Sequence, residues 1–165
     1  MTQALSRRTL FLTAGAVALT GCAPETADAS TRQYANSPFR RVRDAHWRQR
    51  LPRAAYDVLR HEATERPGAS PLNNESRRGT FICRGCDLPL FRSQWKYDSR
   101  TGWPSFYDVI AANIGTKTDY AIGIPRVEYH CARCLGHQGH VFDDGPRPTG
   151  KRYCNNGVAL KFVPA

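Results

Sequence analysis

The 165-residue sequence has no apolar run long enough to cross a membrane. The run from Leu10 to Thr20, broken only by small or hydroxyl residues, covers eleven residues. A helix needs about 20 residues to span a hydrocarbon core of roughly 30 Å. The sequence also lacks an internal repeat, which excludes a solenoid or a repeat array. A single domain with a short appendage fits this length.

Acidic residues are also few, with 14 Asp and Glu against 24 Lys and Arg and a formal net charge of +10. Such an excess favours acidic partners. The basic residues are scattered, however, and indicate a solvated basic surface rather than a nucleic-acid site. With 41% hydrophobic and 23% charged residues the chain can bury a core, which excludes wholesale disorder. The 11 prolines and 13 glycines favour a turn-rich fold over a helix bundle.

Residues 1–22 are typical of a signal sequence. The eleven-residue apolar run has the length of a signal-peptide core. Ser6-Arg7-Arg8 precedes it, as in a twin-arginine export signal. Leu19-Thr20-Gly21-Cys22 resembles a bacterial lipoprotein cleavage box. We therefore expect an exported, periplasmic or extracytoplasmic protein that is attached to a membrane only by a lipid on Cys22. The alternative is an ordinary signal cut nearby, with Cys22 incidental.

Residues 23–38 are small, polar and unpatterned, and we expect a flexible tether there. Residues 39–165 then form the domain. Apolar spacing predicts a helix over Pro52–Thr64, stopped by Pro67 and Gly68.

Short segments rich in aromatic and β-branched residues follow Gly79. Phe81–Cys83 and Val127–Cys131 are predicted strands. In the last stretch Val158, Leu160 and Phe162 are expected on one face, with Ala159 and Lys161 on the other. The pattern predicts a mainly β, mostly antiparallel domain behind one or two N-terminal helices.

Four of the six cysteines form two CxxC pairs, Cys83/Cys86 and Cys131/Cys134. Each pair follows a predicted strand, and four thiolates without an open position suit a structural, tetrahedral Zn²⁺. Three disulfides would also use six cysteines, but lipid on Cys22 would leave an odd number. A redox-active CxxC is a further alternative, although it needs only one pair. We expect an entire sheet between the two pairs because 44 residues separate them.

Cys154 is left without a partner in this scheme. It follows Lys151, Arg152 and Tyr153 and precedes two asparagines. A guanidinium turned toward the sulfur would favour the thiolate, which is the reactive form of cysteine. A buried, inert cysteine is the alternative that the residues alone leave open.

Several motifs, in order, resemble the B-type methionine sulfoxide reductases. They are TERP at Thr64–Pro67, CRGC with DLPLF at Cys83–Phe91, TGWPSF at Thr101–Phe106, CARC at Cys131–Cys134 and GHQGHVFDDGPRPTGKRYCNNG at Gly136–Gly157. The resemblance covers about Leu51 to Phe162. It implies two small antiparallel sheets (Mss4-like), a structural zinc site remote from the chemistry, and reduction of the R epimer of methionine sulfoxide in oxidised proteins or peptides.

The resemblance also implies roles for individual residues. Cys154 would be the nucleophile and become a sulfenic acid, the reversible first rung of cysteine oxidation. One histidine would protonate the sulfoxide oxygen, directly or through water. Trp103 would pack on the substrate methyl group. His137, His140 and Asp144 would form a polar cluster around the sulfoxide oxygen, and Asn156 would complete its hydrogen bonds. The catalytic set is Cys154, His140, His137, Asp144, Arg152 and Asn156.

One position departs from the family pattern. Many members have a cysteine just before GWPSF that resolves the sulfenic acid, and Thr101 stands there in this chain. We therefore expect a single-cysteine mechanism in which a thioredoxin-like or other thiol reductant regenerates Cys154. We also expect a monomer that does not bind nucleic acid. The alternatives from other classes are a nucleic-acid-binding zinc module and a thiol–disulfide oxidoreductase.

Overall fold

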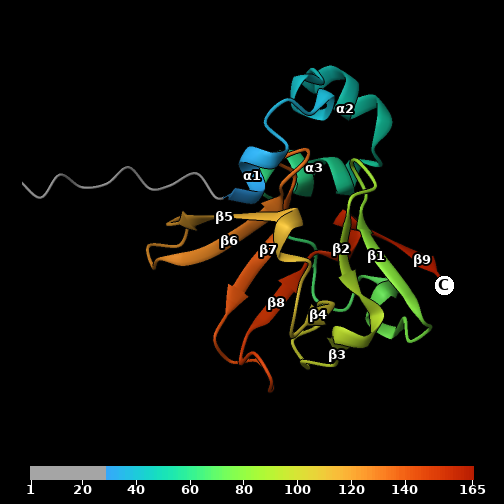
Figure 1. Cartoon of the computed structure of the whole chain (residues 1–165), viewed down its shortest axis with the longest axis vertical. Helices are drawn as coiled ribbons and strands as arrows, with labels where there is room; N and C mark the ends of the chain where they lie inside the picture. The colour runs from blue at the N-terminus through green and yellow to red at the C-terminus, as the bar shows by residue number, and fades with distance from the viewer. Residues whose placement is uncertain (1–28) are drawn as a thin grey trace, which may run out of the picture.

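The computed structural model describes residues 29–165. The expected signal at 1–22, with Cys22, and residues 23–28 of the expected tether lie outside the described residues. Two antiparallel sheets form the body of the molecule, and the helices gather at one end of it (Figure 1). This arrangement confirms the predicted fold class.

Three short α-helices precede the sheets, and five 3₁₀ turns are interspersed along the chain. The helices are α1 (Ala29–Gln33), α2 (Asp44–Arg50) and α3 (Arg53–His61); the turns are η1 (Pro38–Arg41), η2 (Pro71–Asn74), η3 (Ser93–Trp95), η4 (Ala111–Asn113) and η5 (Gly157–Ala159). Over residues 29–165 none of the helices has both the length and the apolar character that a bilayer crossing requires.

Helix α3 is the helix that the sequence predicts, and it is shorter at its C-terminal end. It starts after Pro52 and ends at His61, because Glu62 adopts a left-handed conformation with φ 57°. The amide of Glu62 then bonds back to the carbonyls of Asp57 and Val58, which closes the helix. Its apolar face is buried against β7 and η5.

The structure differs from the expected tether over residues 29–38. Helix α1 lies against η4 and β5, and the Ser30 hydroxyl donates to the carbonyl of Ile114. The Tyr34 hydroxyl donates to Asn113 Oδ1 at 2.9 Å. Hydroxyl side chains within this polar stretch therefore find backbone and amide acceptors on the domain, which composition alone does not reveal.

The two sheets contain nine strands. The three-stranded sheet has the order β2 (Pro89–Arg92), β1 (Gly79–Cys83), β9 (Leu160–Pro164); the six-stranded sheet has the order β3 (Lys96–Tyr97), β4 (Ser105–Phe106), β8 (Arg152–Asn155), β7 (His137–Phe142), β6 (Arg126–Cys131), β5 (Ile114–Asp119). The strands β2 to β5 and most of β6 lie between the two CxxC pairs, but they belong to both sheets, and each sheet is completed by strands outside this interval. The expectation of one entire intervening sheet was therefore wrong.

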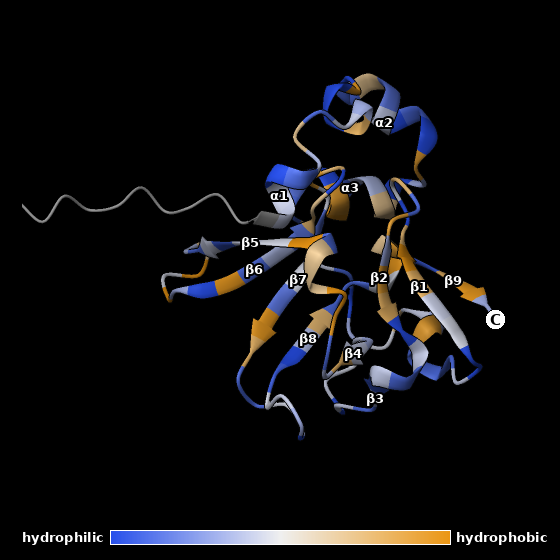
Figure 2. Cartoon of the chain, viewed as in Figure 1, coloured by the Kyte–Doolittle hydropathy of each residue, from blue (hydrophilic) through white to orange (hydrophobic). Residues whose placement is uncertain are grey.

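Aromatic side chains join the two sheets. Phe91 of β2 stacks on Phe106 of β4, with ring centroids 4.1 Å apart, and Phe81 of β1 meets the same ring edge-on at 4.9 Å. All three side chains are fully buried, as is Tyr129 of β6. Figure 2 shows the corresponding hydrophobic colour along β1 and β2. This core fixes β4 and β8, which carry the residues of the site described below.

The prediction of a strand from Val158 was wrong at its start. Residues 157–159 form the turn η5, and β9 begins at Leu160. Ala159 is fully buried instead of facing away from Leu160, because the 3₁₀ turn breaks the two-residue alternation of a strand.

Candidate functional site

The four CxxC cysteines form one buried cluster. Cys83 ends β1 and Cys131 ends β6. The two CxxC turns, which we call knuckles, share a conformation. The amides of Asp87 and Leu135 each donate at 2.8 Å to the carbonyl of the first cysteine of their own turn. Asp87 and Leu135 also share a positive φ, 61° and 59°. Each turn therefore directs its two sulfurs to one point.

The geometry of the cluster fits a tetrahedral metal ion. All four sulfurs lie within 4.8 Å of one another, with Cys83 and Cys134 at 3.6 Å and Cys86 and Cys131 at 3.5 Å. Zinc–sulfur bonds of about 2.3 Å place tetrahedral ligands about 3.8 Å apart. Hydrogen bonds among the thiols raise the pKa of Cys83 and Cys131 and lower the pKa of Cys86 and Cys134. All four could be thiolates together only around a cation, so these residues could hold a metal ion.

Cys154 is the one cysteine in residues 29–165 outside this cluster. It lies in β8, between β4 and β7, opposite Ser105 on one side and His140 on the other. Directly opposed residues in an antiparallel sheet point to the same face. The register therefore brings the thiol and the imidazole together, although 13 residues separate them in the chain.

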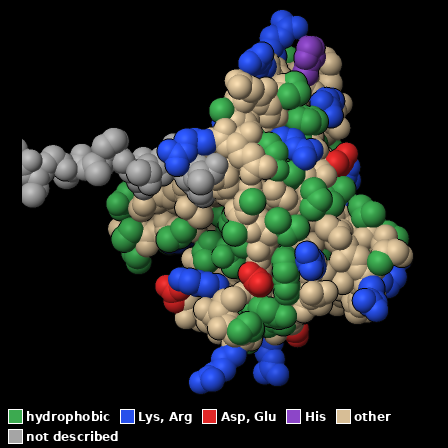
Figure 3. All heavy atoms as spheres, in the orientation of Figure 1, with side chains coloured by type: hydrophobic (Ala, Val, Ile, Leu, Met, Phe, Trp, Pro, Cys, Tyr) green, Lys and Arg blue, Asp and Glu red, His purple; other side chains and the backbone are tan. Residues whose placement is uncertain are grey.

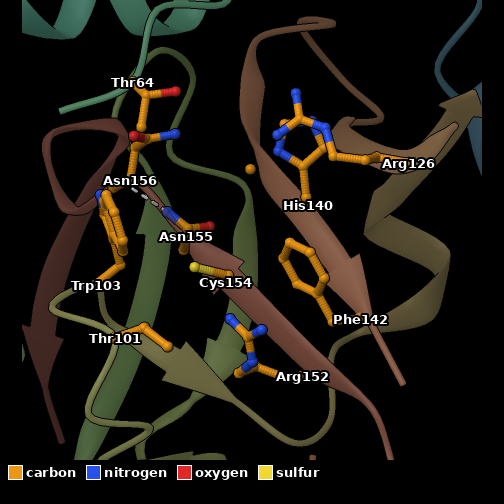
Figure 4. Close-up of a pocket in the computed structure, with 11 residues that line it drawn as sticks. Thr64, Thr101, Trp103, Arg126, His140, Phe142, Arg152, Cys154, Asn155 and Asn156 are labelled. Carbon is orange, nitrogen blue, oxygen red and sulfur yellow. Dashed lines mark hydrogen bonds between the residues drawn. The ribbon is translucent and has the colours of Figure 1, made fainter. Parts of the chain in front are cut away.

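Cys154 lines a pocket of about 290 Å³, at the small end for a ligand site. In Figure 4 its sulfur lies between Trp103 on one side and His140 and Phe142 on the other. The pocket is lined by Thr64, Thr101, Trp103, Arg126, Gly139, His140, Phe142, Arg152, Cys154, Asn155 and Asn156. Such a site can admit one side chain of a larger substrate.

The pKa of Cys154 is set by burial and by polar neighbours that act in the opposite direction. Burial is the largest influence and raises the pKa of the thiol. The Arg152 guanidinium and the hydroxyls of Thr101 and Ser105 act in the opposite direction without cancelling it. The predicted contact between Arg152 and the sulfur is present, but in the free protein it does not by itself make Cys154 a thiolate.

Asp144 orients Arg152 rather than joining the histidines. Its two carboxylate oxygens accept hydrogen bonds from Nε and Nη2 of Arg152, both at 2.7 Å. The guanidinium carbon also lies 4.2 Å from the centre of the Phe142 ring. A bidentate ion pair of this kind fixes the plane of the guanidinium. Asp144 does not line the pocket, so its predicted place at the sulfoxide oxygen differs from its position here.

His140 is held by two residues that sequence reasoning missed. Its Nε2 lies 2.7 Å from Asp119 Oδ2, which also accepts from Arg126 Nη2 at 2.5 Å. Burial lowers the pKa of His140, and Asp119 opposes that effect. Hydrogen bonds from the amide of Ala121, from His140 and from Arg126 lower the pKa of Asp119, which is therefore ionised at neutral pH. The imidazole thus faces the pocket with a carboxylate behind it.

His137 lies behind His140 and does not line the pocket. Its ring centre is 5.5 Å from that of His140, and its side chain is only 3% exposed. Nδ1 lies 3.2 Å from Oε1 of the buried Glu128, which also pairs with Lys117. Although burial raises the pKa of Glu128, these two partners lower it overall. His137 therefore contacts the site through His140 in this structure.

The backbone of Glu65 links Trp103 to Asn156. Trp103 Nε1 donates to the carbonyl of Glu65 at 3.0 Å, and the Glu65 amide donates to Asn156 Oδ1 at 3.0 Å. Asn156 Nδ2 in turn donates to the carbonyl of Gln138. Both predicted residues line the pocket, but the amide of Asn156 bonds to backbone groups instead of to the histidines. It fixes the wall that carries the indole.

Comparison with known proteins identifies the family. Residues 51–164 match the SelR domain. Peptide methionine sulfoxide reductase MsrB of Pseudomonas putida is 52% identical over 120 residues, 72% of this chain and 90% of that protein. The MsrB of Agrobacterium fabrum is 44% identical over 129 residues, 78% of this chain and 96% of that protein. The chain belongs to the SelR-domain family of B-type methionine sulfoxide reductases. This confirms the resemblance inferred from its motifs.

The chain spans less of its longer relatives. It is 45% identical over 134 residues to peptide methionine sulfoxide reductase B1, chloroplastic, of Arabidopsis thaliana, which is 66% of that protein. The corresponding share of the rice protein of the same name is 56%. The match therefore covers nearly the whole of these two bacterial proteins and about two thirds or less of the two plant ones.

Thr101 is the position at which this member of the family departs from the pattern that includes a second cysteine. It lines the pocket with Cys154 and acts on that thiol as a hydrogen-bonding neighbour. Its Oγ1 lies 2.8 Å from Oγ of Ser99, which is 2.7 Å from Oγ of Ser105. A chain of hydroxyl groups thus occupies the side of Cys154 on which a resolving thiol is expected.

Proposed function

We propose that this protein reduces the R epimer of methionine sulfoxide in oxidised proteins and peptides, with Cys154 as the nucleophile. The observation that supports this most directly is the position of Cys154, opposite His140 and beside Trp103 in a pocket of side-chain size. Relatives that are 44% and 52% identical are named for the same substrate class.

The Cys154 thiolate attacks the sulfoxide sulfur, and the oxygen gains a proton as negative charge builds on it. The hydroxyl group then passes from the substrate sulfur to the cysteine sulfur: a new sulfur–oxygen bond forms on Cys154, the substrate's sulfur–oxygen bond and the sulfur–sulfur bond made by the attack both break, and methionine leaves. Cys154 is left as a sulfenic acid. The substrate sulfur is reduced by two electrons, and the cysteine sulfur is oxidised by two. The product lies on the reversible part of the oxidation ladder.

His140 is the group best placed to supply the proton, directly or through one water molecule. Its imidazole lines the pocket and is backed by Asp119, whose carboxylate favours the protonated ring. Proton transfer by a positioned side chain contributes typically about 10²–10⁴-fold. His137 packs behind His140 and supports its ring. Asp144 orients Arg152, whose guanidinium acts on the Cys154 thiol.

Trp103 provides the apolar wall for the substrate methyl group. Its indole nitrogen is bonded to the Glu65 carbonyl, which leaves the ring face free to pack against the methyl group. Epimer selection then follows from geometry: the methyl group meets the indole, and the oxygen meets His140. The other epimer would exchange these two groups.

The metal that the CxxC cluster holds is proposed to be structural Zn²⁺. Cys83, Cys86, Cys131 and Cys134 would bind it, and the ion would tie the end of β1 to the end of β6. It supplies folding free energy rather than chemistry. The residues of the pocket contribute no ligand to it.

Recycling of Cys154 is proposed to use an external thiol. Thr101 occupies the position of the usual resolving cysteine, and the other four described cysteines form the metal cluster. An external thiol attacks the sulfenic acid and releases water, and a second thiol then releases Cys154 from the mixed disulfide. A thioredoxin-like dithiol supplies both thiols. We also propose that the enzyme is a monomer.

The export and anchoring of the protein are proposed from the sequence alone. Arg7 and Arg8 would direct export by the twin-arginine route, and Cys22 would carry the lipid that attaches the domain to a membrane. Export after folding would let the four metal-binding thiols take up their ion before they meet an oxidising compartment.

The proposed activity is tested with the two separated epimers of a methionine sulfoxide peptide in a coupled assay. Turnover of the R epimer alone supports the proposal. Equal turnover of both epimers, or turnover of the S epimer only, would refute it.

A further inference from the structure

The turn between β5 and β6 carries an unusual amount of exposed apolar surface. Tyr120, Ile122 and Ile124 are 67%, 61% and 65% exposed, the highest values among the large hydrophobic residues of the described part. We call these three residues the hairpin patch. Figure 3 shows hydrophobic side chains gathered at this end of the hairpin, which projects beyond the remaining strands in Figure 1. A cluster of this kind marks a contact surface more often than scattered single residues do.

The patch is attached directly to the site. Asp119 and Arg126 are register partners at the base of the turn, and their side chains bond to each other. Asp119 also bonds to His140, and Arg126 lines the pocket. Tyr120 follows Asp119 in the chain, and Ile124 stands two residues before Arg126, a backbone distance of about 7 Å at most.

The turn is also preorganised. The Ala121 amide donates to Asp119 Oδ1 at 2.7 Å, and the Gly123 amide donates to the Tyr120 carbonyl at 2.9 Å. Gly123 has a φ of 77°, a conformation that residues with a side chain rarely adopt. The apolar side chains are therefore presented by a hydrogen-bonded turn, which reduces the conformational entropy lost when a partner binds.

We propose that the hairpin patch binds the apolar residues that flank methionine sulfoxide in a non-native polypeptide. This rests on the function proposed above and deepens it. The pocket accepts one side chain, so neighbouring residues of a peptide must lie on the surface around it. Methionine is commonly buried among other apolar side chains, and its oxidation disrupts such cores. Segments exposed by oxidation therefore carry apolar neighbours.

The dimensions agree with this assignment. An extended peptide advances about 3.3–3.6 Å per residue. Because Ile124 stands two positions from Arg126, which lines the pocket, a few residues of peptide suffice to join a sulfoxide in the pocket to the patch. The patch and the pocket then adjoin, with Arg126 between them. Folded substrates cannot present such a segment and would not use the patch.

The test compares two short fluorescent peptides, each with one R-methionine sulfoxide, flanked either by leucine or by serine. The double variant Ile122→Ser/Ile124→Ser removes two side chains of the patch, and Val163→Ser, an exposed residue of the other sheet, is the matched control. Anisotropy gives the Kd, and steady-state kinetics give kcat/KM. In the double variant we expect the Kd of the leucine peptide to rise about tenfold, equivalent to about 1.4 kcal/mol. The serine peptide and the control variant should be unaffected.

Equal losses with both peptides, or no loss with either, would overturn the docking role. A double variant that binds the leucine peptide normally but no longer sediments with phosphatidylglycerol vesicles would assign the patch to a lipid surface instead. If the unmodified protein turns over neither peptide, the proposed enzymatic function fails, and the anisotropy measurement still decides whether the patch binds apolar peptides.

Discussion

Replacing Asp119 by Asn tests the arrangement that holds His140. The substitution keeps the size of the side chain and removes its charge. Asp119 uses one oxygen for the Ala121 amide and the other for both His140 and Arg126. An amide has only one acceptor oxygen, so it cannot accept all three hydrogen bonds. The expected result is a displaced imidazole in a folded protein.

The magnitude is limited by what His140 contributes. A positioned general acid is worth typically about 10²–10⁴-fold. Loss of its orienting partner should remove part of this, and we expect kcat to fall about 10- to 100-fold while KM changes little. The assay is steady-state reduction of an R-methionine sulfoxide peptide with dithiothreitol, measured across the pH range in which the protein stays folded.

The pH dependence separates this role from general damage. Asp119 raises the pKa of His140, so its removal lowers that pKa further, and the protonated ring then persists only at lower pH. The loss of rate should therefore be largest at high pH and shrink as the pH falls. Arg126 lowers the pKa of His140, and Arg126→Met should shift the profile the opposite way. An unchanged kcat, or a loss independent of pH, would refute this account of His140.

Three further variants test other parts of the site and its location. Cys83→Ser should lower the thermal unfolding temperature and the metal content together, as measured by calorimetry and elemental analysis; full retention of both would contradict a structural ion. Thr101→Cys should form a disulfide with Cys154 after oxidation and speed thioredoxin-driven turnover, and an unbridged oxidised variant in mass spectrometry would count against that position. Cys22→Ala should release the protein from membranes, and unchanged fractionation would end the lipid-anchor hypothesis.

The local features of the fold were predictable because each depends on neighbours in sequence. Helix α3 follows from apolar spacing after a proline. The two knuckles follow from a CxxC pair whose first cysteine ends a strand. The start of β9 was not predictable in this way. Ala159 has the position of an outward-facing residue by alternation, but a 3₁₀ turn that packs on α3 buries it.

The catalytic roles of Cys154 and His140 were predictable only by resemblance to a family. The residues that hold His140 depend on strand register. Asp119 lies 21 residues before His140, and the pairing of β5 with β6 and of β6 with β7 brings them together. Asp119 could have been found from the hairpin pattern: an acidic residue, Asp119, and a basic residue, Arg126, stand on either side of a short turn that contains a glycine. The position of Asp144 in the family motif marked it as a site residue, but its bidentate pair with Arg152 depends on how the segment before β8 folds back and could not be predicted from that position.

The central claim is that Cys154 takes the oxygen from methionine sulfoxide. A single-turnover experiment tests it directly: the reduced protein is mixed with one equivalent of an R-methionine sulfoxide peptide, trapped with dimedone and analysed by mass spectrometry. The account predicts one methionine formed per protein and a dimedone adduct on Cys154 alone. Methionine formation with no adduct on Cys154, or with a disulfide that includes a cysteine of the metal cluster, would contradict it.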